Sequence, residues 1–258
     1  MAIKTLNTVA NKEKVQSILT FNNDFKKTTT CTICEMIYNT KIPADVEVHK
    51  KYHLEFTNGI SWPSTLMSSE AVTFNLIRHN SKPQTGKLNL VRNQNSIQVT
   101  IQTIDKSNKR QIGKIEKLLN MVNQELDASD DSKQWRDSNF ERSKAFVVII
   151  NNKAMGLCTT DTVNEGKWMI FKNQKIVPNQ QISGIKIGIS RIWISPKWRR
   201  LGLGLKLLNY VCENSIYGQR LQSGQIAFSQ PSSAGGKLAK SFNGVKHKSG
   251  EILIPVYL

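Results

Sequence analysis

The chain has 258 residues, of which 36 are Lys or Arg and 19 are Asp or Glu, and its formal net charge at pH 7 is +17. This length allows one full domain and a small module with a hydrophobic core of their own. No stretch approaches the ~18 consecutive apolar residues of a membrane span, and residues 1–10 lack the apolar core of a secretion signal, so we expect neither membrane insertion nor secretion. The four cysteines are too few for a disulfide scaffold and suit a reducing compartment.

The first 96 residues divide into three segments of different composition. Residues 1–27 are polar with scattered apolar positions and are predicted to be a disordered tail. Residues 28–56 contain paired Cys and paired His and are predicted to form a small metal-binding module. Residues 57–96 are rich in Ser, Asn, Thr and Lys, which is typical of a linker, although apolar residues within it, such as Trp62, could pack on a neighbouring element.

From residue 97 to residue 258 the pattern indicates an α/β domain. Apolar and polar residues alternate over 97–101, as in a half-buried strand, and apolar residues then recur at spacings of three and four over 112–126, as in an amphipathic helix. Two apolar runs within 145–160 flank an Asn-Asn-Lys turn and predict a hairpin. The remaining predicted elements are strands at 167–171, 185–194, 225–229 and 252–257, and helices at 201–216 and 237–242.

Four potential zinc ligands occur close together as Cys31-x2-Cys34 and His49-x3-His53. Zinc prefers four such ligands in a tetrahedron, and a turn with two thiolates followed by a helix with two imidazoles supplies them. The sequence therefore predicts a structural zinc finger over 28–56, against the alternative of four unrelated residues. One finger reads only about three base pairs, so a structural or partner-docking role is favoured over sequence-specific DNA reading.

A second motif, Arg199-x-x-Gly202-x-Gly204, lies between the predicted strand 185–194 and the predicted helix 201–216. Backbone amides of such a loop and the N-terminus of the following helix can bind a pyrophosphate, although a tight turn also needs glycine. The surrounding residues 186–258 hold eleven Lys and Arg but only two acidic residues, which suits a polyanionic partner such as nucleic acid or a phosphorylated cofactor. A dinucleotide-binding fold would place the loop after its first strand, whereas here it comes late.

The Arg199 motif resembles the acetyl-CoA loop of the GCN5-related N-acetyltransferases. Three further stretches, 188–193, 227–231 and 236–239, resemble the cohesin acetyltransferases that establish sister-chromatid cohesion, as does the predicted finger. The resemblance covers 28–56 and 97–258. It implies the α/β fold of the GCN5-related N-acetyltransferases, a mixed sheet flanked by helices, preceded by a small zinc finger.

The resemblance implies a nuclear, S-phase enzyme that transfers acetyl from acetyl-CoA to lysines on the ATPase head of a cohesin SMC subunit, in association with chromatin. Zinc, bound by Cys31, Cys34, His49 and His53, would be structural. The implied cofactor-binding residues are Ile192, Trp193 and Ile194 for the pantetheine arm, Arg199, Arg200, Leu201, Gly202, Leu203, Gly204 and Leu205 for the pyrophosphate, and Ser232, Ser233 and Ala234 near the thiol end. The proposed role of Ile192 and Trp193 uses only their main chain, so that their side chains could equally be core.

The proton acceptor is less clear, because an attacking lysine is protonated at neutral pH and must lose a proton first. Family members tend to have an acidic residue at the position of Asn209, and some have Asp at that of Gln230, but neither residue here is a base. Glu213, one helical turn beyond Asn209, could accept the proton through a water, or it could be a surface carboxylate. Ser190 could orient the amine or a water, and the substrate could also supply the base.

One hypothesis on a partner and one competing function remain. Residues Gln16 to Asn23 resemble the family's sliding-clamp peptide, with Asn22 and Asn23 in place of the usual aromatic pair, and a chance Gln-x-x-Leu is the alternative. The competing function is a zinc-finger DNA- or chromatin-binding scaffold with a catalytically weak acetyltransferase fold. Residues 28–56 contain three Lys and four acidic residues, which disfavours DNA binding by the finger.

Overall fold

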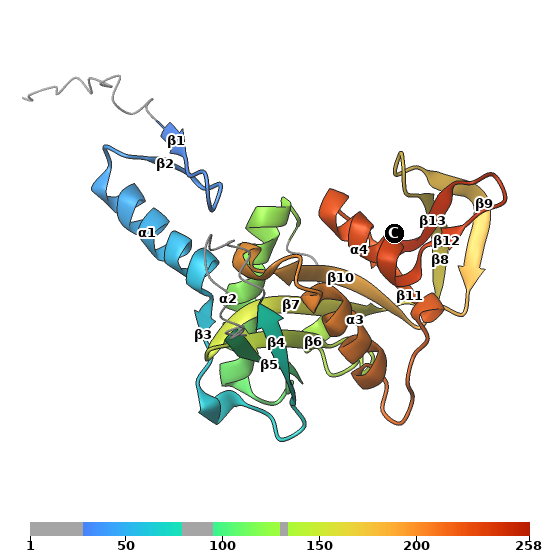
Figure 1. The fold of residues 1–258 in the computed structure, drawn as a ribbon, viewed down its shortest axis with the longest axis horizontal. Coiled ribbons are helices and arrows are strands. Elements are labelled where there is room, and N and C mark those ends of the chain that lie inside the picture. Colours follow the sequence, from blue (N-terminus) through green and yellow to red (C-terminus); the bar gives the residue numbers. More distant parts are fainter. Residues whose placement is uncertain (1–27, 79–94, 130–133) are drawn as a thin grey trace, which may run out of the picture.

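The computed structural model describes residues 28–78, 95–129 and 134–258, and one large mixed sheet forms the centre of its fold (Figure 1). The strands of this sheet are β3 (Ile60–Ser61), β4 (Val72–Arg78), β5 (Asn95–Thr103), β6 (Ala145–Ile150), β7 (Lys153–Thr162), β8 (Glu165–Ile170), β9 (Ile176–Ser183), β10 (Ile187–Ile194), β11 (Ile226–Ser229), β12 (Val245–Lys246) and β13 (Ile252–Tyr257). Their spatial order is β4-β5-β6-β7-β10-β11-β13-β8-β9, with β3 paired to β7 and β12 to β13. The pairs β10–β11 and β11–β13 are parallel.

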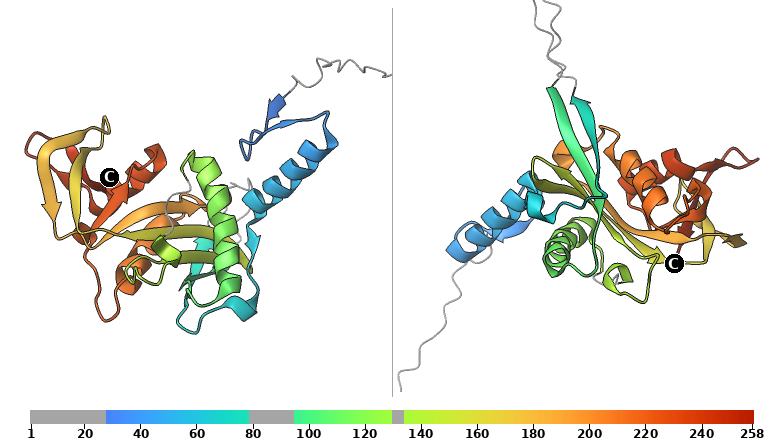
Figure 2. Two further views of the ribbon diagram at one scale, coloured as in Figure 1. Left: turned by 180° about the vertical axis from the view of Figure 1, so that it is seen from behind. Right: turned by 90° about the horizontal axis from the view of Figure 1, so that it is seen from below.

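Helices cover both faces of the sheet (Figure 2). The described helices are α1 (Pro43–Asn58), α2 (Lys109–Leu126), α3 (Leu203–Asn214) and α4 (Ser233–Asn243). Successive residues of β6 alternate between the two faces, so that Phe146 and Val148 lie in the core with α3, while Val147 and Ile149 lie in the core with α2. This double burial explains why β6 is a continuous apolar run rather than an alternating one.

The α2 helix is a clear case of local sequence determining structure. Asn108 accepts hydrogen bonds from the backbone N–H groups of Arg110 and Gln111, which caps the N-terminus. The helix ends at Asp127, whose φ of 48° is left-handed. Apolar residues spaced three and four apart, including Ile115 and Leu118, are fully buried against the sheet.

A zinc-finger-like module precedes the sheet and is joined to it. Strands β1 (Thr28–Thr30) and β2 (Ile37–Asn39) form an antiparallel hairpin, and α1 follows. At the end of α1, the ring of Phe56 lies 6.3 Å from that of Trp193 in β10, and Glu55 pairs with Lys117 of α2 at 2.5 Å. The chain then enters the sheet directly through β3, so the end of α1 packs on the core between the sheet and α2.

The structure confirms the predicted strands and helices from residue 97 onward and differs from the predicted linker over 60–78. Trp62 is fully buried, and β4 pairs with β5 in a register that places Phe74 opposite Val99. β4 was not predicted as a strand because Thr73 and Asn75 interrupt its apolar residues and the segments on either side have the polar composition of a linker. Residues 79–94 and the tail 1–27, with the Gln16 to Asn23 peptide, lie outside the described residues.

No helix in the described ranges is both long and apolar enough to span a membrane.

Candidate functional site

The four predicted zinc ligands converge. The ligand atoms of Cys31, Cys34, His49 and His53 all lie within 4.8 Å of one another. The β1–β2 turn brings the two thiols together, and the i, i+4 spacing of the two His places both on one face of α1. The Sγ of Cys31 lies 3.4 Å from Nδ1 of His53.

The chemistry of this cluster fits a bound zinc ion. The backbone N–H groups of Cys34 and then Ile33 are the main causes that lower the pKa of Cys31 to about 6, which favours the thiolate that zinc requires. The Nε2 atom of His49 is buried and has no hydrogen-bond partner among the described residues, as expected for a ligand atom whose partner is a metal. Four protein ligands complete a tetrahedron, which is typical of a structural rather than a catalytic site.

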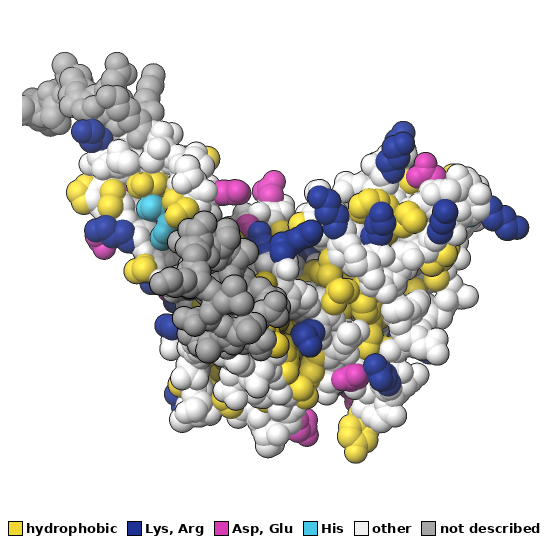
Figure 3. Space-filling model, viewed as in Figure 1, with side chains coloured by type: hydrophobic (Ala, Val, Ile, Leu, Met, Phe, Trp, Pro, Cys, Tyr) yellow, Lys and Arg dark blue, Asp and Glu magenta, His cyan; other side chains and the backbone are white. Residues whose placement is uncertain are grey.

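A cleft forms where β10 and β11 separate. The two strands pair in parallel at Ile187, Gly188 and Ile189, but β10 continues to Ile194 and is paired there only with β7. Within the described residues, one edge of β10 therefore faces the cleft without a neighbouring strand. The cleft has a volume of about 680 Å³ and opens between the end of α2 and the start of α4, where the surface is hollowed (Figure 3).

The predicted pyrophosphate loop lies beyond the end of β10. Arg200 and Gly202 both adopt left-handed backbone conformations, with φ of 63° and 78°, and α3 begins at the next residue. Turns of this kind direct successive backbone N–H groups to one side and bind anions. A Cβ added to Gly202 would meet nothing within 4 Å, whereas one added to Gly204 would lie 3.1 Å from Leu238 of α4. Gly202 is therefore needed for its backbone conformation, and Gly204 for helix packing.

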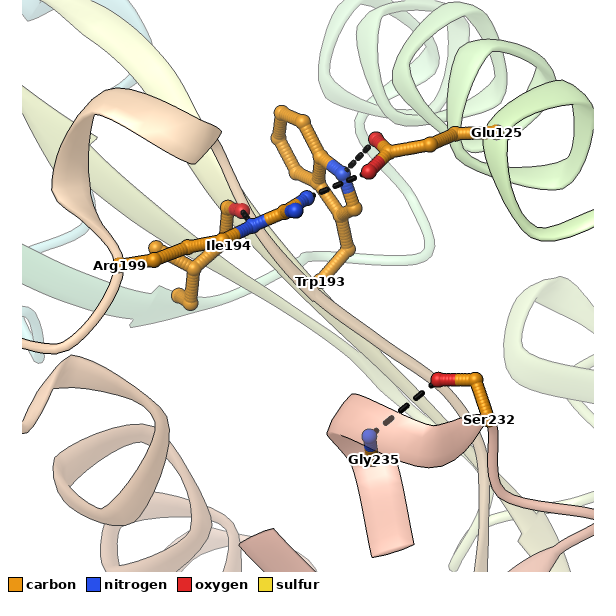
Figure 4. Close-up of polar contacts among 6 residues, drawn as sticks. All are labelled: Glu125, Trp193, Ile194, Arg199, Ser232 and Gly235. Atoms are coloured by element: carbon orange, nitrogen blue, oxygen red, sulfur yellow. Dashed lines mark hydrogen bonds and ion pairs between the residues drawn. The ribbon is translucent and has the colours of Figure 1, made fainter. Parts of the chain in front are cut away.

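Three of the predicted cofactor-binding residues have side chains that serve the fold. Arg199 donates from Nε to the Ile194 carbonyl at 2.7 Å and from a terminal nitrogen to Oε1 of Glu125 at 2.5 Å (Figure 4). The indole N–H of Trp193 donates to the other oxygen of the Glu125 carboxylate. Glu125 thus attaches the end of β10 and the start of the loop to α2, and the sequence analysis did not identify it. The side chains of Trp193 and Ile194 are buried. The core alternative, which was stated for Ile192 and Trp193, agrees with the buried Trp193, whereas Ile192 is half-buried and packs against the core.

The start of α4 borders the cleft. Ser232 caps this helix by accepting a hydrogen bond from the backbone N–H of Gly235 at 3.2 Å (Figure 4). Ser232 lines the cleft, and Ser233 and Ala234 are exposed in the first turn.

The structure separates the four predicted catalytic residues into two groups. Ser190 and Gln230 line the cleft. Asn209 and Glu213 do not appear among its described lining residues, and Glu213 lies at the far end of α3, where it forms a half-exposed ion pair with Arg220 at 3.3 Å. Glu213 is therefore a surface carboxylate in this structure, which was one of its two predicted roles.

We accordingly expect Glu213→Gln to retain the wild-type rate of acetyl transfer, because the substitution changes only an exposed ion pair of small energetic value. Single-turnover rates at saturating acetyl-CoA would measure this. Asn209→Asp is the companion variant on the same helix. A loss of rate for the first or a gain for the second would place this face of α3 in proton transfer.

Two further residues at the base of the cleft were not predicted from the sequence. The hydroxyl of Tyr257 in β13 donates to Oδ2 of Asp161 in β7 at 2.8 Å, and both residues line the cleft. A signal for Asp161 existed, because it is a carboxylate at the end of the buried run of β7. Asp161 lies in β7, which precedes the loop motif in the sequence, so no local pattern connects this carboxylate with the loop.

The divergence of β10 and β11 and the left-handed turn before α3 agree with the families that the sequence matches. Residues 114–216 match the acetyltransferase (GNAT) family. The solved structure of the xEco2 acetyltransferase domain bound to a K105-CoA conjugate has the same fold, with a TM-score of 0.50 and 21% identity over 63% of this chain and 92% of that chain. The protein therefore has the GNAT acetyltransferase fold.

More specific matches cover the finger and the end of the chain. Residues 16–55 match the zinc-finger of acetyl-transferase ESCO, and residues 183–253 match the ESCO1/2 acetyl-transferase family. The chain is 43% identical to the N-acetyltransferase ECO1 of Debaryomyces hansenii, over 96% of this chain and 90% of that protein. Identity to the Saccharomyces cerevisiae ECO1 is 34%, over 95% and 94% of the two chains. The chain belongs to the ECO1/ESCO family of N-acetyltransferases, with acetyl-CoA as cosubstrate and zinc as structural metal.

Proposed function

We propose that the protein transfers the acetyl group of acetyl-CoA to lysine side chains on the ATPase head of a cohesin SMC subunit. The transfer would take place in the nucleus during S phase, on chromatin, and would establish sister-chromatid cohesion. Membership of the ECO1/ESCO family supports this proposal. The observation that carries the enzymatic part is the cleft between β10 and β11, since it presents one edge of β10 to a ligand.

In this proposal acetyl-CoA lies along the free edge of β10. The main chain of Ile192, Trp193 and Ile194 would hydrogen-bond the pantetheine arm, which needs no particular side chains and is compatible with the buried indole of Trp193. The turn 200–205 and the N-terminus of α3 would bind the pyrophosphate. Ser190 and Ile194 are four positions apart, and at ~3.3 Å per residue the free edge spans about 13 Å.

The reactive end would then lie at the base of the cleft. With the pyrophosphate at the loop, the thioester is directed toward Ser190 and the N-terminus of α4, where Ser232, Ser233 and Ala234 begin the helix. A main-chain N–H at this end of β10 would stabilise the negative charge that develops on the thioester oxygen. Acetyl-CoA supplies the activated acyl group, and the chain must orient the lysine and accept its proton.

The charge of the surface suits an acidic partner. Lys and Arg side chains outnumber acidic ones over the part of the visible face formed by α3, α4 and the strands beside them (Figure 3). These groups would attract the phosphates of the cofactor and acidic segments of the substrate. We also propose that Gln16 to Asn23 binds the replication sliding clamp and brings the enzyme to replicating DNA.

The proposal is tested by incubating the full-length protein with acetyl-CoA and a purified cohesin head, and by mapping acetylated lysines with mass spectrometry. We expect acetylation of lysines on the SMC head that requires both the enzyme and acetyl-CoA. A matched reaction with the Gly202→Asp variant controls for chemical acetylation by the thioester itself. If the protein binds the head or DNA and no lysine gains an acetyl group above this control, the scaffold hypothesis is correct instead.

A further inference from the structure

A carboxylate lies at the base of the cleft, next to the point where β10 and β11 diverge. Asp161 pairs with Gly188 in the β7–β10 register, and the last residue of β10 that pairs with β11 is Ile189. The side chain of Asp161 is only 9% exposed and lines the cleft. The described cleft lining contains four titratable side chains: Asp127, Asp161, Arg191 and Tyr257. Asp127 is exposed at the end of α2, so Asp161 is the buried carboxylate at the fork.

Tyr257 reaches this carboxylate across Gly188. The tyrosine comes from β13, and its hydroxyl donates to Oδ2 of Asp161 at 2.8 Å. A Cβ added to Gly188 would lie 2.4 Å from the ring of Tyr257, which is closer than any real contact, so position 188 must be glycine for the ring to pass over it. Because Gly188 has no side chain, the phenol of Tyr257 can lie over β10, between the cleft and the buried carboxylate of Asp161.

Hydroxyl groups and one cation surround the pair. The Ser229 hydroxyl donates to the Ser190 carbonyl at 2.8 Å, at the point where β11 ends and β10 continues. The guanidinium of Arg191 also donates to the Ser190 carbonyl, at 2.9 Å, and so is directed to the main chain. Burial, followed by the charge of Asp161 and the hydrogen bond to it, raises the pKa of Tyr257, and hydrogen bonds with Ser190 and Ser229 oppose this shift only in part. Tyr257 therefore remains a neutral donor to Asp161, and its oxygen still has lone pairs that can accept a proton.

We propose that Tyr257 and Asp161 form the proton relay of the acetyl transfer. As the lysine ammonium gives one proton to the Tyr257 oxygen, the phenolic proton moves along the existing hydrogen bond to Asp161, and no tyrosinate forms. The neutral amine attacks the thioester carbonyl carbon, the C–S bond breaks, and the second amine proton leaves with the CoA sulfur as thiol. This assignment rests on the proposed transfer to lysine and supplies the acceptor that neither Asn209 nor Gln230 can provide.

The alternative is that the pair only fastens β13 to β7. The Asp161→Asn variant distinguishes the two roles, because an asparagine oxygen can accept the same hydrogen bond but the amide is not a base at neutral pH. The assay measures single-turnover acetylation of a cohesin head and of poly-lysine, at saturating acetyl-CoA and across a range of pH. Calorimetry for acetyl-CoA and thermal melting run in parallel.

If the relay operates, we expect Asp161→Asn to lower the transfer rate at neutral pH by about 10²-fold or more, with unchanged acetyl-CoA affinity and melting temperature. The deficit should narrow as the pH rises toward the lysine pKa of about 10.4, because more of the amine is then already neutral. Tyr257→Phe keeps the ring and removes the hydroxyl, and it should show the same deficit. If Asp161→Asn does not fold, Tyr257→Phe decides the question alone.

Several outcomes would overturn the relay. The first is a wild-type transfer rate in folded Asp161→Asn or in folded Tyr257→Phe. The second is a deficit in the transfer rate that does not change with pH. The third is a loss of rate in Asp127→Asn, because this variant removes the other carboxylate side chain of the described cleft lining. If the wild-type protein acetylates poly-lysine but not the head, the proposed substrate is wrong and the relay is still tested. If it acetylates neither, both the proposed function and the relay are wrong.

Discussion

Replacing Cys34 with Ser should remove the zinc and unfold the module of residues 28–56. The module has almost no core of its own, because Phe56 is the only described residue of α1 that is buried, and β1 and β2 are three residues each. The free energy of zinc binding, on the order of 10 kcal/mol for such sites, therefore supplies the folding free energy of the hairpin and of the first turns of α1. Elemental analysis and hydrogen exchange would measure the loss of metal and of protection.

The sheet should survive this substitution, because the core between the sheet and α3 contains no residue of the module. On the other face of the sheet the module contributes Cys34 and Phe56 to a core that consists mainly of residues from α2 and the sheet. We expect acetyl-CoA binding to persist. Cys212→Ser is the matched control, since Cys212 is also a buried thiol but lies in α3, away from the metal cluster. Stoichiometric zinc in Cys34→Ser would show that the four-ligand assignment is wrong.

Replacing Gly202 with Asp should weaken acetyl-CoA binding by about 100-fold, which corresponds to ~3 kcal/mol. The side chain would place a negative charge at the N-terminus of α3, where the proposed site binds the pyrophosphate with bare backbone N–H groups. The left-handed conformation at this position adds a strain of ~1 kcal/mol for any residue with a Cβ. Calorimetry with acetyl-CoA measures the affinity.

Gly218→Asp is the control for position, because it introduces the same charge and the same backbone strain away from the proposed pyrophosphate site. Gly218 has a φ of 69°, and an added Cβ there also meets nothing within 4 Å, but it lies in the turn after α3 rather than before it. We expect this variant to lose a similar amount of stability and to bind acetyl-CoA with wild-type affinity. Equal affinities for a folded Gly202→Asp and the wild-type protein would contradict the phosphate-loop assignment.

Much of the fold was predictable because the spacing of apolar residues in the sequence matches the period of each helix or strand. The runs in β6 and β7 and the helical spacing in α2 are visible without any tertiary information. The outer strands β4 and β9 were not predicted, because a strand at the edge of a sheet has mixed polar residues on its exposed side and resembles a loop. Their positions depend on pairing with β5 and β8, which a local pattern does not contain.

The zinc cluster and the loop were predictable for a different reason. Their chemistry requires particular residue types at short, fixed spacing. The motifs Cys31 to His53 and Arg199 to Gly204 can therefore be identified from the sequence alone. Asp161 and Tyr257 are 96 residues apart, and they meet only because β7 and β13 flank the β10–β11 pair. Glu125 likewise reaches Arg199 from α2, 74 residues earlier. No spacing rule indicates such contacts.

A crystal structure of the protein with acetyl-CoA tests the central claim most directly. We expect the pantetheine arm between β10 and β11, hydrogen-bonded to the main chain of 192–194, with the pyrophosphate on the turn 200–205 and the thioester beside Ser190, near Tyr257 and Asp161. A cofactor bound outside the cleft of β10 and β11, or a thioester directed away from Ser190, would contradict both the proposed binding mode and the proton relay.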